Sequence, residues 1–157
     1  MNKYIIVLRV LLVAMICFIW GNSLIPAQQS SEISTYVQEV ITEILEEFIE
    51  FDTSNSSVST FSIRKLAHFC EFMTLGGLLL LNFFPKNRQN LINIIFVGFS
   101  VAFLDETIQM FIKGRGSEIK DVWIDFSGLI CGIILMYLFV IIVYKVKEKV
   151  QYKKKFV

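Results

Sequence analysis

Charged residues are scarce in this sequence, since Asp, Glu, Lys and Arg make up only 18% of its 157 residues. Apolar residues make up 55%, and the mean hydropathy is +0.62. This balance excludes an ordinary water-soluble domain and is typical of a membrane protein. The net charge is +1 and the basic residues are spread along the chain, so we expect no nucleic-acid partner. The length indicates a single domain over 1–157.

Motifs for metal binding and covalent catalysis are lacking as well. The three cysteines, Cys17, Cys70 and Cys131, fall in three different apolar segments with no CxxC spacing. We interpret them as small packing residues rather than as a disulfide framework or a zinc site. The sequence has no glycine-rich phosphate loop and no nucleophile elbow, and it has a single histidine. Its chemistry must therefore be sought in its few charged groups.

Four long apolar runs are present, at about 4–21, 66–84, 91–112 and 122–144. Each is long enough for a helix that crosses a bilayer. A cleaved signal peptide is the alternative for the first run, but a clear A-x-A site does not follow it, and we favour a retained anchor. The sequence thus predicts an all-α, polytopic membrane protein with a four-helix transmembrane bundle.

A polar section separates the first two runs. Over about 31–51, apolar residues recur at helical spacing between many glutamates, which predicts an acidic amphipathic helix that is too polar to span. It can lie on the membrane surface or cap the bundle, and binding of a protein partner is the second interpretation.

The basic residues predict the orientation. The tail 145–157 is rich in lysine, and with the N-terminus inside, four spans return this tail to the inside. Basic residues on that side then outnumber those on the other, which favours N- and C-termini in the cytoplasm and an extracellular acidic helix.

This topology places the charged residues of three spans at one height. The second and fourth runs enter from outside and the third ends there, so their charged ends lie within about 10–12 Å of the outer interface. Spacings of three and four residues also place them on common helix faces. We expect His68 to lie within about 11 Å of the nearest acid of the third run. The candidate ligand-binding residues are Arg64, Lys65, His68, Glu71, Asp105, Glu106, Gln109, Arg115, Asp121 and Asp125.

Two pairs of glycines are interpreted as packing sites. Gly128 and Gly132 form a GxxxG in the fourth run, and Gly76 and Gly77 are adjacent in the second. Glycines at such positions allow two helix backbones to approach closely.

Acidic groups outnumber basic ones in the candidate set, and charge inside a bilayer is expensive. Either some carboxyl groups are protonated or a cation belongs there. Four interpretations follow: a structural polar cluster, a pocket for an envelope component, an acid–base enzyme, or a metal site. The best catalytic candidates are His68, Glu71, Asp105 and Glu106. A metal would use His68 and Glu71 with Asp105 or Glu106. Neither a reaction nor a cofactor is fixed by the residues.

These residues also carry a family resemblance. RKLAHFCEF at 64–72, LDETIQ at 104–109, GR at 114–115 and DVWIDFSGLICG at 121–132 resemble the VanZ-like family of small bacterial membrane proteins, as does GNS at 21–23. Phe72 and Asp125 depart from it, since the family commonly has tyrosine and asparagine there. The resemblance implies a location in the bacterial cell membrane and an association with lowered susceptibility to teicoplanin-type glycopeptides. It implies no settled reaction, cofactor or partner.

Taken together, the sequence predicts an outward-facing polar pocket that binds a cell-envelope component. The basic members of the set suit an anionic lipid-linked cell-wall precursor or a peptide carboxylate. A membrane enzyme that acts on a lipid-linked substrate and a structural or partner-binding protein are the alternatives.

Overall fold

The computed structural model describes residues 3–48, 60–84, 88–116 and 118–155, and it is built from helices. These are α1 (Lys3–Ser23), α2 (Ala27–Phe48), α3 (Thr60–Asn82), α4 (Arg88–Met110) and α5 (Ile119–Lys155). The described residues contain no strand. The predicted all-α class is confirmed.

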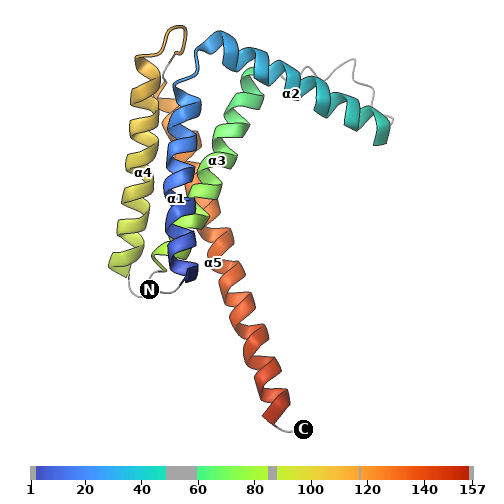
Figure 1. The fold of residues 1–157 in the computed structure, drawn as a ribbon, viewed down its shortest axis with the longest axis vertical. Coiled ribbons are helices and arrows are strands. Elements are labelled where there is room, and N and C mark those ends of the chain that lie inside the picture. The colour runs from blue at the N-terminus through green and yellow to red at the C-terminus, as the bar shows by residue number, and fades with distance from the viewer. Residues whose placement is uncertain (1–2, 49–59, 85–87, 117, 156–157) are drawn as a thin grey trace.

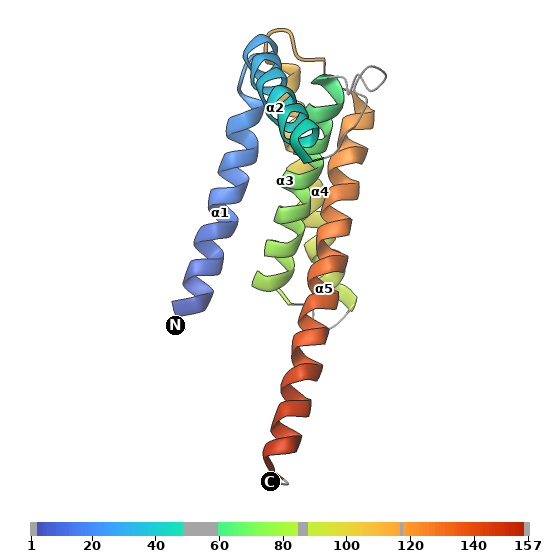
Figure 2. The ribbon, with the colours of Figure 1, turned by 90° about the vertical axis from the view of Figure 1, so that its right-hand side faces the viewer.

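Four of the helices form an upright bundle, and α2 starts at one end of it and projects sideways past α3 (Figures 1 and 2). α1 and α4 run toward the α2 end, whereas α3 and α5 run away from it. The N- and C-termini therefore lie at the same end of the bundle, as four antiparallel spans require. The connections from α1 to α2 and from α4 to α5 lie at the opposite end.

Three helices, α1, α4 and α5, are long and apolar enough to cross a membrane. The predicted second span, 66–84, is not among them. It belongs to α3, which begins at Thr60 and therefore contains the charged and polar side chains of Arg64, Lys65, His68 and Glu71. These lower its mean hydropathy, so the crossing of the membrane by α3 stays a prediction.

The last helix is longer than its predicted span. α5 has 37 residues and continues the apolar run 122–144 through the lysine-rich tail. At about 1.5 Å per residue it is about 55 Å long, well beyond the roughly 30 Å of a hydrocarbon core. Its last turns extend past the rest of the bundle (Figure 1). The basic tail is thus a continuous extension of the helix as far as Lys155.

α3 and α5 make the most extensive contact between helices, and glycines bring their backbones together. A methyl group at Gly128 would overlap the carbonyl of Phe69, and one at Gly132 would overlap the carbonyl of Met73. Gly76 of α3 meets the carbonyl of Leu129 in the same way. The packing role predicted for the GxxxG is confirmed.

The apolar core lies along α3. Phe72, Leu75, Leu79 and Leu80 of α3 are almost completely buried, and Ile19 of α1 and Leu129 of α5 pack with them. The polar residues of the candidate site lie toward the α2 end of this core, because they occupy the starts of α3 and α5 and the end of α4.

α2 keeps an apolar stripe exposed. It begins four residues before the predicted 31–51, and residues 49–51 lie outside the described part of the chain. The side chains of Ile33 and Tyr36 are 55% and 68% exposed, so the bundle does not cover them. This arrangement suits a helix that lies on a membrane surface.

Candidate functional site

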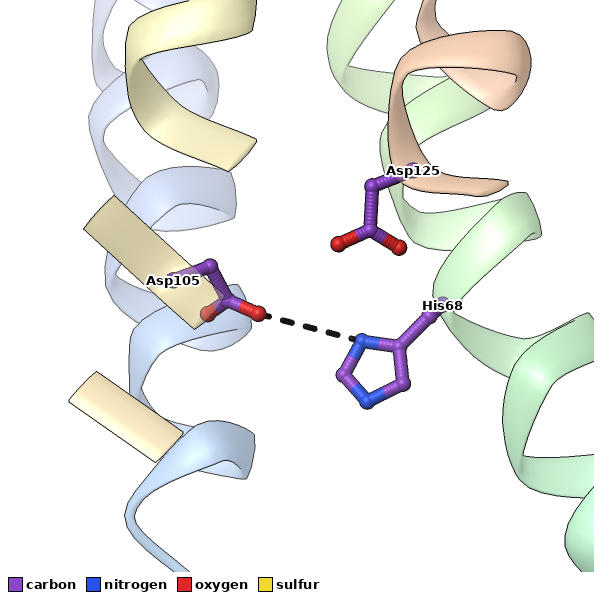
Figure 3. A group of neighbouring side chains, drawn as sticks. All are labelled: His68, Asp105 and Asp125. Carbon is purple, nitrogen blue, oxygen red and sulfur yellow. Dashed lines mark ion pairs between the residues drawn. The ribbon is translucent and has the colours of Figure 1, made fainter. Parts of the chain in front are cut away.

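His68 of α3 lies at the centre of the polar residues. Its Nδ1 atom is 4.0 Å from Oδ2 of Asp105 on α4 and 3.7 Å from Oε2 of Glu71, one turn further along α3. Figure 3 shows the imidazole between α3 and α4, with Asp125 of α5 pointing toward the same space. The expected proximity of His68 to an acid of α4 is confirmed.

A small cavity of about 20 Å³ opens beside His68. This volume is enough for a water molecule or an ion. Side chains from three helices line it: Arg64, Lys65, His68, Glu106, Gln109, Asp121, Ile124 and Asp125. Most of the predicted ligand-binding residues thus meet at one place, and Glu71, Asp105 and Arg115 lie outside the lining.

Asp105 lies just behind this lining and is completely buried. It accepts hydrogen bonds from the Ser23 hydroxyl (2.6 Å) and from the Gln109 amide (3.0 Å). The Gln109 amide also approaches Ser23 Oγ at 3.3 Å. The end of α1 therefore fixes the orientation of a carboxylate on α4.

Asn22 holds Glu71 in the same manner. Its amide donates a hydrogen bond of 2.7 Å to Glu71 Oε1, while Glu71 Oε2 is buried with no hydrogen-bond partner in the described structure. Sequence reasoning did not place Asn22 or Ser23 among the site residues. The signal for them in the sequence was the GNS at 21–23, which follows an apolar run and is part of the family resemblance.

Arg115 points to α1 rather than into the cavity. Its Nε and Nη2 atoms donate hydrogen bonds of 2.9 and 2.8 Å to the carbonyls of Ile25 and Asn22. The preceding Gly114 has a φ of +80°, a conformation that favours glycine and turns the chain at this point. Burial lowers the pKa of Arg115, and the nearby Arg64 acts in the same direction. The guanidinium nevertheless stays charged, because its ordinary pKa lies far above neutrality.

Two further contacts order the start of α5. Lys65 forms an ion pair of 2.7 Å with Asp121, and both side chains are about three-quarters buried. The backbone N–H of Glu118 donates a hydrogen bond of 3.0 Å to Glu106. Carboxylates near a helix N-terminus interact favourably with the helix dipole. Lys65 and Asp121 thus join α3 to α5 at the mouth of the cavity.

Three of the polar residues are close enough to share a metal ion. His68, Asp105 and Asp125 each offer one ligand atom, and these atoms lie within 4.8 Å of one another. The sequence predicted His68 and Glu71 with Asp105 or Glu106 as the ligands. The structure keeps His68 and Asp105 in the group and adds Asp125, because α5 lies tightly against α3.

Chemically, the site combines the cations Arg64 and Lys65 with buried carboxylates and an imidazole.

The family of the chain follows from its sequence, since the model of the VanZ/LLP1 family matches residues 8–141. The chain belongs to the VanZ/LLP1 family. The VanZ/LLP1 match includes every candidate site residue and leaves out the last turns of α5. No curated protein and no solved structure gave a match. With its apolar helices, the chain is a VanZ-like membrane protein.

Proposed function

We propose that this VanZ-like protein binds an anionic group of a cell-envelope component at the outer face of the bacterial membrane and thereby lowers susceptibility to glycopeptides such as teicoplanin. The observation that carries the proposal is the meeting of charged side chains from α3, α4 and α5 around one cavity. Ionisable groups in transmembrane helices are expensive, and they usually mark functional sites.

The cations of α3 suit an anion. Arg64 and Lys65 both line the cavity, and a guanidinium can bind a carboxylate or a phosphate through two parallel hydrogen bonds. Gln109 adds a neutral amide to the lining. A lipid-linked cell-wall precursor or a peptide carboxylate offers such an anion.

The size of the cavity limits how the ligand binds. A space of about 20 Å³ admits a group the size of a water molecule, so only the polar end of the ligand reaches His68. The rest would lie at the end of the bundle from which α2 projects (Figure 1). An extracellular α2 with its exposed stripe can contact the membrane surface or a protein partner there.

A membrane enzyme is the second candidate. His68 lies between two carboxylates, at 3.7 and 4.0 Å, and a histidine in such a position can transfer protons. His68 with Glu71 or Asp105 would then act as acid and base on a lipid-linked substrate. This candidate predicts a changed lipid or precursor in mass spectra of envelope extracts from cells that express the protein.

Antibiotic susceptibility in intact cells tests the proposal. The minimal inhibitory concentration of teicoplanin is measured in cells with the wild-type chain, with Glu71→Gln, with Asp105→Asn and without the chain. Expression of the wild type should raise it, and both variants should return it to the background level at unchanged abundance in the membrane. Wild-type behaviour of both variants would contradict the proposed role of the pocket. A loss of protein from the membrane would instead favour a purely structural polar cluster.

A further inference from the structure

We propose that His68, Asp105 and Asp125 bind one divalent metal ion, Zn²⁺ or Mn²⁺, between α3, α4 and α5. This inference names a cofactor for the pocket of the proposed function, and it rests on that assignment of the pocket. The three residues come from three helices, and the metal would join them at one point (Figure 3).

The spacing of the three groups fits a shared ion after a small adjustment. Their ligand atoms lie within 4.8 Å of one another. Nitrogen and oxygen ligands bind tetrahedral Zn²⁺ at about 2.0–2.2 Å, so two ligand atoms of one ion lie about 3.3–3.6 Å apart. Side-chain rotations that shorten the longest separation by about 1.2–1.5 Å would complete the site.

Asp125 gives the second, independent indication of a ligand. It is 2% exposed, and no hydrogen bond or ion pair joins its carboxylate to another described residue. The carboxylate lines the cavity and points toward His68 and Asp105 (Figure 3). Buried carboxylates are normally paired, hydrogen-bonded or bound to metal. A metal ion would supply the partner that Asp125 lacks.

His68 and Glu71 also have atoms available for a metal. His68 Nδ1 is buried without a hydrogen-bond partner in the described structure, and so is Oε2 of Glu71, at a distance of 3.7 Å. Nδ1 can therefore act as the nitrogen ligand. Glu71 is placed to supply a fourth ligand, and the cavity has room for a bound water instead.

The residues behind the ligands support their orientation. Asp105 accepts hydrogen bonds from Ser23 and Gln109, and Glu71 accepts one from Asn22. Metal-binding carboxylates are commonly held by such outer contacts, which fix the ligand before the ion arrives. One imidazole with two or three carboxylates favours Zn²⁺ or Mn²⁺ over Ca²⁺, which takes oxygen ligands alone.

Metal content tests the site directly. The full chain is purified in detergent, and a chelator removes any bound metal. It is then incubated with ZnCl₂ or MnCl₂ and desalted, and its metal content is measured by inductively coupled plasma mass spectrometry. We expect about one ion per chain for at least one of the two metals. Asp125→Asn should lower the affinity at least about 100-fold, because it replaces a carboxylate ligand with a weak amide ligand.

Asp121→Asn is the matched control. It makes the same change in the same cavity, but Asp121 pairs with Lys65 and is not one of the three ligands. This variant should retain the ion. A wild-type chain with less than about a tenth of an ion, or equal binding by both variants, would overturn the metal site. If Asp125→Asn does not fold, His68→Gln is used in its place. The electron paramagnetic resonance signal of free Mn²⁺ should also fall when metal-free wild-type protein is added, and an unchanged signal together with no bound Zn²⁺ would overturn the site.

The metal site and the proposed function can fail separately. A chain without metal that still raises the teicoplanin inhibitory concentration overturns the metal site and leaves the proposed function intact. A chain that binds one ion through Asp125 without any effect on susceptibility supports the metal site and overturns the proposed function.

Discussion

Helix α3 packs against α5 and against α4 in two different ways. Toward α5, the contact is between helix backbones at Gly128, Gly132 and Gly76, because glycine has no side chain to separate them. Toward α4 the contact is sparser, and at the α2 end of the bundle the polar pair His68 and Asp105 spans it. The cavity lies at that polar contact. The comparison indicates that the glycine contact holds the bundle, whereas the polar contact leaves space for a ligand.

The largest effect is expected from breaking the glycine contact. Gly132→Ala would place a methyl group against the carbonyl of Met73, which is helix backbone and cannot rotate away. Overpacking of this kind typically destabilises by about 1–3 kcal/mol. Unfolding of the purified chain by titration with sodium dodecyl sulfate should show this loss.

The matched control for this change is Gly21→Ala. A methyl group there has no neighbour within 4 Å. Stability should stay close to that of the wild type. Equal stability of both variants would contradict the close approach of α3 and α5.

An intermediate effect is expected at the polar contact. Ser23→Ala removes the hydroxyl that donates to the buried Asp105 and lies beside the Gln109 amide. A buried polar group that loses its hydrogen-bond partner lowers the stability of the folded protein by about 1–3 kcal/mol. The loss is smaller where another group or a water molecule takes the place of the partner. The same titration should show a loss smaller than that of Gly132→Ala.

Ser100→Ala is the control, since its hydroxyl donates a hydrogen bond to the carbonyl of Phe96 in its own helix and has no other partner among the described residues. It should change stability little. A double-mutant cycle between Ser23→Ala and Asp105→Asn sharpens the test. Strictly additive losses would show that the two side chains do not interact.

The smallest effect on stability is expected at the mouth of the cavity. Lys65→Gln removes the ion pair with Asp121, whose side chains are 24% and 22% exposed. Partly exposed ion pairs contribute about 0.2–1 kcal/mol, so the folded protein should persist. The teicoplanin inhibitory concentration should nevertheless fall, because the mouth loses a cation.

Lys113→Gln provides the comparison, because Lys113 is exposed and does not line the cavity. It should leave both stability and susceptibility unchanged. If cells with Lys65→Gln and cells with Lys113→Gln have equal susceptibility to teicoplanin, the charge of Lys65 has no role in binding.

Much of this arrangement could be predicted from the sequence. Apolar runs identify α1, α4 and α5, and the GxxxG identifies a face of α5 that another helix can approach closely. His68 and Asp105 were expected at one height because four antiparallel helices leave few places for their charges. These inferences depend only on helix geometry and on the expense of charge in lipid.

Contacts between distant segments could not be predicted in the same way. Asn22 and Ser23 read as the end of an apolar run, and their partners Glu71 and Asp105 are 49 and 82 residues away in the chain. Arg115 was expected to face a ligand, but it donates hydrogen bonds to the carbonyl of Asn22 at the end of α1 and to that of Ile25 in the α1–α2 connection. Such choices depend on how the helices rotate about their axes, which spacing along one helix does not fix.

The orientation of the polar end is the claim on which the envelope function depends, and thiol labelling of intact cells tests it most directly. Single cysteines replace Lys113, near the cavity end, and Lys147, in the last turns of α5, in a chain whose three native cysteines are changed to alanine. A membrane-impermeant maleimide should label the cysteine at position 113 in intact cells, and the one at 147 only after permeabilisation. The reverse pattern would place the cavity at the cytoplasmic face and contradict the account.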